Sequence, residues 1–199
     1  MANVGIMGGT FDPPHFAHLL IAESAYEQSD LDYVLFMPGG NPPHKNGNDV
    51  TEASLRFEML NVAISDNNHF KISDYEVKKQ EYSYTVNTLE YLKEKNPGDN
   101  LFFILGEDSL AYLDKWYCPE KIVEYATIVV YPRGVNSNLD YEVDRIKKQL
   151  GADIKIIDAP VFDISSSEIR ERVKEKKTIR YMTPQSVIDI IEKEKLYDR

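Results

Sequence analysis

The chain has 199 residues, 42% of them hydrophobic and 28% charged, and a formal net charge of −10 at pH 7. This composition predicts one globular domain with a full core, and the negative charge argues against a surface that coats nucleic acid or binds anionic membranes. The single cysteine excludes an internal disulfide and a CxxC metal site, and with no signal-peptide pattern and no apolar run of about 18 residues we expect a cytoplasmic protein.

Apolar runs and helical patterns alternate along the chain. Nearly continuous apolar runs predict strands buried on both faces of a parallel sheet, at residues 4–7, 33–37, 101–105, 127–131 and 154–157. Helical patterns follow at residues 15–28, 52–65, 85–95, 141–150, 166–175 and 184–195. This order predicts a doubly wound, Rossmann-like α/β sheet. We expect a single domain over residues 1–199 whose C-terminal part, from about residue 165, is helical.

The segment after the first predicted strand has the features of a phosphate-binding site. The strand ends at Gly8-Gly9-Thr10, and a helical pattern with His15 and His18 follows. Glycines let backbone N–H groups approach a phosphate, and a helix start adds partial positive charge. Two histidines three residues apart share one face of a helical turn.

Plainer interpretations of this segment remain open. The glycines are also expected in any tight strand-to-helix turn, and the histidines could be core or capping residues. The pattern matches neither GxGxxG nor GxxxxGK[ST], which argues against a hydride-transfer enzyme and a P-loop NTPase. No third ligand at suitable spacing supports zinc, and Asp12 is predicted to be a helix N-cap rather than a ligand.

A second polar segment lies at residues 163–170. Ser165 and Glu168 match a capping box, whereas several hydroxyls at a helix start followed by Arg170 would also bind a polyphosphate. The two interpretations are compatible. Thr183 followed by Pro184 predicts the N-cap and first residue of the last helix.

Two further loops follow predicted strands, where ligands bind in parallel sheets. The loop after residue 37 carries His44 and Lys45, which add donors to an acidic chain, although an exposed turn is the plainer interpretation. After residue 105, Asp108 suits either a ribose hydroxyl or a helix N-cap. Trp116 fits a core wall or a ring-stacking position. We interpret Cys118 as structural, since no helix start or basic neighbour is evident beside it.

Together these segments resemble a known family. Residues 8–18 are similar to the nucleotidyltransferase signature built around an (H/T)xGH element, and residues 164–170 are similar to its distal ISSTxxR partner. Residues 41–45, 83–85 and 106–116 resemble bacterial nicotinate-nucleotide adenylyltransferases, and the similarity covers the whole chain. Ala17 stands where the family motif usually has Gly, which bears on the shape of the adenine site rather than on the chemistry.

The resemblance implies transfer of AMP from ATP to nicotinate mononucleotide, giving deamido-NAD and pyrophosphate in NAD biosynthesis. It implies four catalytic residues: His18, His15, Lys45 and Arg170. The ATP-binding residues that it implies are Gly8, Gly9, Thr10, His15, His18, Gly106, Asp108, Ile164, Ser165, Ser166 and Arg170. Those implied for the nicotinate nucleotide are Asn41, His44, Lys45, Thr85, Trp116 and Tyr117. Mg²⁺ is expected with ATP, held by phosphates and water rather than by a protein cage.

Three other functions stay open at this point. The nearest is another nucleotidyltransferase on the same scaffold that uses nicotinamide mononucleotide, phosphopantetheine or a polyol phosphate. A regulatory module could bind nucleotide without chemistry, although it need not keep all four cations at His15, His18, Lys45 and Arg170. A structural interaction domain fits least well, because cations gather behind strand ends in an acidic chain. The sequence leaves the oligomeric state open.

Overall fold

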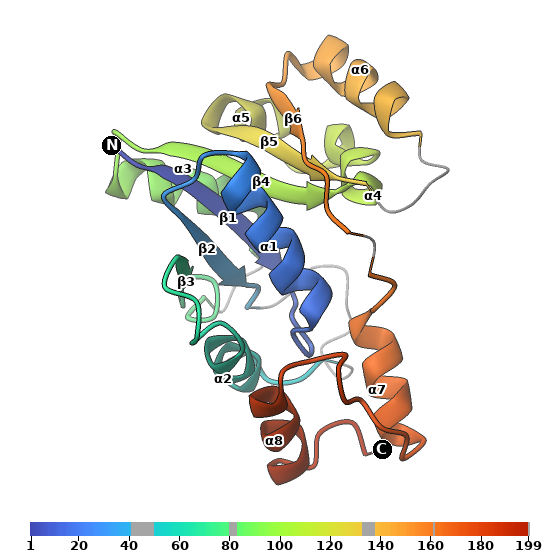
Figure 1. Ribbon diagram of the computed structural model, residues 1–199. Coiled ribbons are helices and arrows are strands. Elements are labelled where there is room, and N and C mark those ends of the chain that lie inside the picture. The colour runs from blue at the N-terminus through green and yellow to red at the C-terminus, as the bar shows by residue number, and fades with distance from the viewer. Residues whose placement is uncertain (41–49, 80–82, 133–137, 161, 199) are drawn as a thin grey trace. The chain divides into compact units, whose positions relative to one another are not determined.

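The computed structural model describes residues 1–40, 50–79, 83–132, 138–160 and 162–198 (Figure 1). Its strands are β1 (Asn3–Gly9), β2 (Tyr33–Pro38), β3 (Phe70–Ile72), β4 (Asn100–Gly106), β5 (Ala126–Tyr131) and β6 (Ile154–Ile156). Its helices are α1 (Phe16–Gln28), α2 (Ala53–Ala63), α3 (Thr85–Lys95), α4 (Glu107–Leu110), α5 (Pro119–Tyr125), α6 (Leu139–Leu150), α7 (Ser166–Lys174) and α8 (Gln185–Lys193), with a 3₁₀ turn η1 (Leu113–Lys115). Among the described residues, no helix is long and apolar enough to span a bilayer.

The strands form one sheet in the order β3-β2-β1-β4-β5-β6. Strand β1 pairs in parallel with β4, which pairs in parallel with β5, and β5 pairs in parallel with β6. The strand order reverses between β1 and β4, which is the arrangement of a doubly wound Rossmann-like fold, and ligands bind beyond the carboxyl ends of the strands at such a point. The predicted fold class is therefore confirmed.

All five predicted strands are present, but the sequence patterns missed several short elements. Strand β3 has three residues, α4 has four and α5 has seven. Each of these spans at most about two hydrophobic periods, which is too few repeats to show a pattern in the sequence. Because α5 begins directly after Cys118, which has a left-handed φ of 51°, the statement that no helix starts beside this cysteine was wrong.

The chain folds into two compact units, each built from three segments. The first unit comprises residues 1–8, 21–35 and 84–161, and the second comprises residues 9–20, 36–83 and 162–199. The expectation of a single domain over the whole chain stays a prediction. The predicted C-terminal helices are α7 and α8, and both belong to the second unit.

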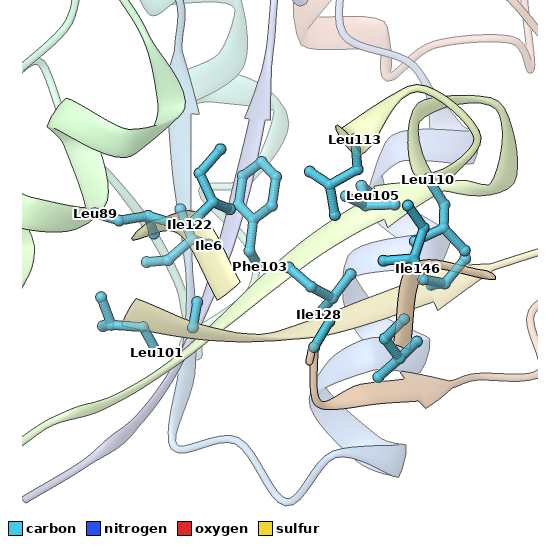
Figure 2. Close-up of a cluster of buried hydrophobic side chains, with 14 of the residues drawn as sticks. Ile6, Leu89, Leu101, Phe103, Leu105, Leu110, Leu113, Ile122, Ile128 and Ile146 are labelled. Carbon is cyan, nitrogen blue, oxygen red and sulfur yellow. The ribbon is translucent and has the colours of Figure 1, made fainter. Parts of the chain in front are cut away.

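The first unit has a core of aliphatic and aromatic side chains between its strands and one layer of helices (Figure 2). Alternate residues of β4, such as Leu101, Phe103 and Leu105, point into this core, as expected for side chains on one face of a strand. Helices α3, α4, α5 and α6 contribute the opposite side, with Leu89, Leu110, Ile122 and Ile146. Helix α6 starts two residues before its predicted start, and its predicted C-terminal glycine, Gly151, is confirmed with a left-handed φ of 67°.

The second unit has its own apolar cluster, formed by α2, α7 and α8. Met59 and Ala63 of α2 pack with Ile169 of α7 and with the buried face of α8, which includes Val187 and Ile191. The N-cap predicted for α8 was wrong: its N-cap is Pro184 rather than Thr183. The hydroxyl of Thr183 donates instead to the carbonyl of Pro14, 2.7 Å away, so a tertiary contact takes the group that would have capped the helix.

Arg145 links α6 to the segment after α4 within the first unit. Its guanidinium contacts Asp114 Oδ2 at 3.1 Å and Glu142 Oε2 at 2.7 Å, and it donates to the carbonyl of Ala111 at 2.8 Å. The hydrogen bond from Arg145 holds the pKa of the Asp114 carboxyl below its usual value. A carboxyl whose pKa is lower in the folded than in the unfolded state stabilises the fold only while it is ionised.

Replacement of Asp114 by Asn should therefore lower stability in a pH-dependent way. At pH 7 the variant should have a lower urea midpoint than the wild type. The difference should shrink as the pH falls below about 4, the ordinary pKa of Asp, because protonation then removes the same contact from the wild type. Asp144→Asn, at an exposed position of α6, is the matched control. A difference that stays constant from pH 7 to pH 3 would contradict this role of Asp114.

Candidate active site

The two glycines at the end of β1, Gly8 and Gly9, have different surroundings. A Cβ added to the exposed Gly8 would meet only the Phe103 ring, at an ordinary 3.8 Å, so the backbone here is open. A Cβ added to Gly9 would lie 2.9 Å from the ring of Phe11. Gly9 is therefore required because the Phe11 ring packs against its backbone. Phe11 itself is buried and has a left-handed φ of 51°, a conformation that costs a bulky residue about 1–2 kcal/mol.

His15 and His18 form a stacked pair at the start of α1. Their ring centroids are 3.6 Å apart with 23° between the planes, and the Phe11 ring meets His18 edge-on at 4.9 Å. The backbone N–H of His15 donates to His18 Nδ1 at 3.2 Å. Because Nδ1 accepts this hydrogen bond, the proton of a neutral His18 ring resides on Nε2, which is then a donor. The predicted sharing of one face is confirmed.

The prediction that Asp12 is a helix N-cap was wrong. Helix α1 begins at Phe16, and the carbonyl of His15 accepts from the N–H of His18 at 2.9 Å. Asp12 lies four residues before the helix, and its buried carboxylate accepts from the Tyr197 hydroxyl and from the Thr51 N–H. The Asp12 carboxylate, which the local pattern predicted to cap a helix, instead accepts a hydrogen bond from Tyr197, 185 residues away in the sequence.

Arg56, in helix α2, connects the segment after β1 to two other backbone segments of the second unit. This side chain is only 1% exposed, and it donates to the carbonyls of Thr10, Gly40 and Thr51 at 2.8–2.9 Å. Burial lowers its pKa, while the nearby Asp12 carboxylate opposes that shift. A buried guanidinium is stable when its donors are satisfied, and here backbone oxygens accept from it. The sequence pattern around Arg56 indicates no such role, because α2 has the pattern of an ordinary amphipathic helix.

The distal serine segment forms the start of α7, as predicted. Ser165 is the N-cap, and its hydroxyl accepts from the N–H of Glu168 at 3.1 Å, which confirms the capping part of the prediction. Ser166 donates to the carbonyl of Pro13 at 2.8 Å. Ile164, just before the helix, packs against the apolar cluster of the second unit. The serines that the resemblance assigns to ATP thus also have contacts within the protein.

Arg170 is directed at the same loop from the first turns of α7. One of its nitrogens donates to the carbonyl of Asp12 at 2.7 Å, and the other donates to Ser167 Oγ at 3.3 Å. The second unit therefore brings together part of the predicted ATP site, including two regions about 150 residues apart: Gly9, Thr10, His15, His18, Ile164, Ser165, Ser166 and Arg170. Ala17, where the family motif usually has Gly, is buried with 7% exposure.

The first unit holds the predicted residues at the other strand ends. Gly106 ends β4, and a Cβ there would lie 3.1 Å from the Tyr131 ring, so this glycine permits close packing against β5. Asp108 is exposed in the first turn of α4, whose N-cap is Gly106, so Asp108 is not that cap. Thr85 is the first residue of α3. Gly8 belongs to this unit as well.

Trp116 and Tyr117 follow η1 in the first unit. Trp116 is partly buried, packs against the core and meets the Phe103 ring edge-on at 6.1 Å. Tyr117 is 59% exposed, with its ring 4.9 Å from that of Tyr84. A half-buried indole can pack on the core and still stack with the planar ring of a ligand. The predicted Asn41, His44 and Lys45 lie outside the described residues.

The described groups of the second unit suit the binding of a polyphosphate. The second unit offers two imidazoles, a guanidinium and the N-terminus of a nine-residue helix, α7. Such donors bind anions and neutralise developing negative charge. No cluster of three or more His, Cys, Asp or Glu side chains that could hold a metal ion occurs in the described ranges.

Comparison with known proteins identifies the family. Residues 6–172 match the cytidylyltransferase-like family. A probable nicotinate-nucleotide adenylyltransferase of Clostridium botulinum is 43% identical over 199 residues, covering 99% of this chain and 98% of the relative. Proteins with the same description from Caldicellulosiruptor saccharolyticus and Lachnoclostridium phytofermentans are 42% and 41% identical, with 98–99% of this chain and at least 98% of each relative covered.

Solved structures support the same fold. The Plasmodium falciparum nicotinic acid mononucleotide adenylyltransferase, complexed with NaAD, superposes with a TM-score of 0.83 at 24% identity, and its complex with APC with 0.80 at 23%. Both comparisons cover 100% of this chain and 98% of the other. The full-length similarity to relatives above 40% identity agrees with the two sequence motifs, at residues 8–18 and 164–170. The chain therefore belongs to the nicotinate-nucleotide adenylyltransferases, within the cytidylyltransferase-like superfamily, and is an adenylyltransferase of NAD biosynthesis.

Proposed function

We propose that the chain binds ATP and nicotinate mononucleotide and joins AMP to the latter through the residues described above. The observation that carries this proposal is the stacked His15–His18 pair at the start of α1, in the same unit as the capped, serine-rich start of α7. An enzyme that only aligns and neutralises phosphates needs such donors and needs no protein nucleophile.

The proposed reaction is an in-line displacement at the α-phosphorus of ATP. A phosphate oxygen of nicotinate mononucleotide forms the new bond, and the bond from the α-phosphorus to the bridging oxygen of the β-phosphate breaks, so the electron pair leaves with pyrophosphate. The attacking phosphate monoester is largely dianionic at pH 7, because its second pKa is roughly 6. The reaction therefore requires no general base, and negative charge at the phosphorus and on the leaving group is the main barrier.

The residues of the second unit are proposed to stabilise that charge. His18 would be the principal donor to the transition state, since its Nε2 carries the proton when Nδ1 accepts from the His15 backbone. His15 would share the contact with the phosphates. Ser165, Ser166 and Arg170 would bind the β- and γ-phosphates, together with backbone groups of Gly9 and Thr10.

The remaining roles follow the family resemblance. Gly8, Gly106 and Asp108 would bind ATP at the ends of β1 and β4, with Asp108 on the ribose, and Ile164 would border the ATP site. Trp116 would stack on the nicotinate ring, and Thr85 and the backbone of Tyr117 would receive its carboxylate. Asn41, His44 and Lys45 would bind the nicotinate nucleotide, with Lys45 also contacting phosphates.

Mg²⁺ is proposed to accompany ATP. It would be bound by phosphate oxygens and water, as is usual for nucleotide-bound Mg²⁺, and would supply charge neutralisation on the leaving group. We assign no residue of the chain to it. A cytoplasmic, reducing location is part of the same proposal, because the only cysteine, Cys118, has no partner for an internal disulfide.

Product analysis tests the proposal directly. The purified chain is incubated with ATP, Mg²⁺ and one acceptor at a time: nicotinate mononucleotide, nicotinamide mononucleotide or phosphopantetheine. Deamido-NAD and pyrophosphate in equal amounts are expected with the first acceptor. Faster adenylylation of another acceptor would reassign the substrate, and adenylylation of none would favour a nucleotide-binding module without catalysis.

Replacement of His18 by Ala should lower turnover by roughly 10²–10³-fold, because one donor to the developing charge is lost. Pyrophosphate release at saturating substrates is the measurement. His69→Ala, a histidine of the same unit that is not assigned to the site, is the control and should remain within twofold of wild type. Turnover of His18→Ala within a few-fold of wild type would remove His18 from its proposed role.

Replacement of Trp116 by Ala should weaken the binding of nicotinate mononucleotide and leave ATP binding little changed, as measured by calorimetry. Trp116 also packs on the core, so binding is measured well below the unfolding temperature and repeated with Trp116→Leu, which keeps apolar contact. Tyr112→Ala, a 59% exposed aromatic residue of the same unit, is the control. Equal weakening of both ligands would show that Trp116 acts only in the scaffold.

A further inference from the structure

We propose that Tyr197 is a positioning residue for the reaction: its hydrogen bond to Asp12 fixes the loop of residues 10–15, which carries His15 and leads into helix α1, where His18 lies. The inference rests on the proposed function, because it assumes that these histidines act on the phosphates. It concerns contacts within the second unit only. Nothing in the local sequence around Tyr197 indicates a role near the N-terminal motif.

The contact itself is short and buried. The Tyr197 hydroxyl donates to Asp12 Oδ1 at 2.7 Å, and the N–H of Thr51 donates to the other carboxylate oxygen at 3.2 Å. Asp12 is only 1% exposed. A buried carboxylate needs donors, and hydrogen bonds to a charged group are stronger than those between neutral groups. Loss of the tyrosine hydroxyl therefore leaves one oxygen of a buried carboxylate without this donor.

Asp12 connects this contact to two groups assigned to catalysis. Its backbone carbonyl accepts from Arg170 at 2.7 Å, and His15 follows it by three residues. The loop lies between β1 and α1 without regular secondary structure, so no helical or strand ladder fixes its backbone. A shift of Asp12 would therefore move both the Arg170 contact and the approach to the stacked histidines.

Other groups from the C-terminal part of the chain hold the loop at neighbouring positions. Ser166 donates to the carbonyl of Pro13 and Thr183 donates to that of Pro14. The N–H of Phe16 donates to the carbonyl of Met182 at 3.0 Å. The bond from Tyr197 differs from these because it acts through the side chain of Asp12, so it can be removed without changing a backbone partner.

Backbone hydrogen bonding and apolar packing define the conformation of residues 195–197, which carry this hydroxyl. After α8 the N–H of Leu196 donates to the carbonyl of Ile191, and both Lys195 and Tyr197 have left-handed φ values, of 51° and 67°. Such conformations are unfavourable for residues other than glycine and persist where surrounding contacts determine them. The Tyr197 ring packs against the apolar cluster of the second unit, which supplies those contacts.

The Tyr197 hydroxyl stays protonated and therefore remains a hydrogen-bond donor. Burial and the nearby Asp12 carboxylate both raise the pKa of its hydroxyl above the ordinary value. A phenol with a raised pKa stays protonated throughout the pH range in which the reaction would be assayed. The Tyr197 hydroxyl therefore keeps its proton and donates a hydrogen bond to Asp12, and it does not act as a base.

The test is Tyr197→Phe in the full chain, with Tyr181→Phe as the matched control. The first variant keeps the packed ring and removes only the hydroxyl, while Tyr181 belongs to the same unit and is 83% exposed. We expect kcat to fall about tenfold, which is the scale of one lost hydrogen bond to a charged group. The KM for nicotinate mononucleotide should stay within twofold, because the ring-binding residues proposed for it, Thr85 and Trp116, belong to the first unit.

A second readout separates positioning from stability. With selectively labelled histidines, NMR signals of His15 and His18 should shift in Tyr197→Phe, while the signal of His69 should not. The proposal requires both the fall in kcat, measured well below the unfolding temperature, and these shifts. Unchanged kcat, or a lower kcat with unchanged His15 and His18 signals, would overturn it. If the wild type forms no deamido-NAD, the proposed function has failed, and the NMR comparison alone then decides whether Tyr197 positions the loop.

Discussion

The described part of the site depends on how one irregular loop obtains hydrogen-bond partners. Residues 10–15 connect β1 to α1 without a ladder of hydrogen bonds of their own, and their buried carbonyls must still be satisfied. Arg56 supplies a donor to Thr10, and Arg170 supplies one to Asp12. Hydroxyls of Ser166 and Thr183 serve the two prolines that follow. The conformation that presents the histidines is thus imposed by residues 46 to 169 positions further along the chain.

Two of the cations in this acidic chain, Arg56 and Arg170, hold the backbone of this loop. Arg56 is buried and donates to the backbone carbonyls of Thr10, Gly40 and Thr51, so it supports the backbone rather than a ligand. Arg170 donates to the Asp12 carbonyl and is also proposed to bind phosphate. A guanidinium has five N–H donors in a fixed plane, so one face of contacts can anchor the loop while other donors serve a ligand. The same residue can therefore organise the site and act in it.

Aromatic contacts also hold the two histidines in place. Gly9 lacks a side chain where the Phe11 ring packs, and that ring meets His18 edge-on. His18 then stacks on His15, whose backbone N–H fixes the His18 tautomer. A donor with a defined tautomer and orientation stabilises developing charge without reorganisation, which is the basis of electrostatic catalysis. In the first unit, β4 ends at Gly106 and the apolar core packs against Trp116.

The sequence by itself determined the strand and helix alternation, the fold class, the capping role of Ser165 and the sharing of one face by His15 and His18. These features are local, because hydrophobic period, caps and residue spacing act within one or two turns. It missed the short β3, α4 and α5, because each spans at most about two periods and gives too few repeats for a pattern. It misassigned Asp12 and Thr183 as caps, because cap preferences cannot reveal a competing partner. Only the tertiary structure decided that Asp12 meets Tyr197 and that Thr183 holds Pro14, since those bonds join groups 185 and 169 residues apart.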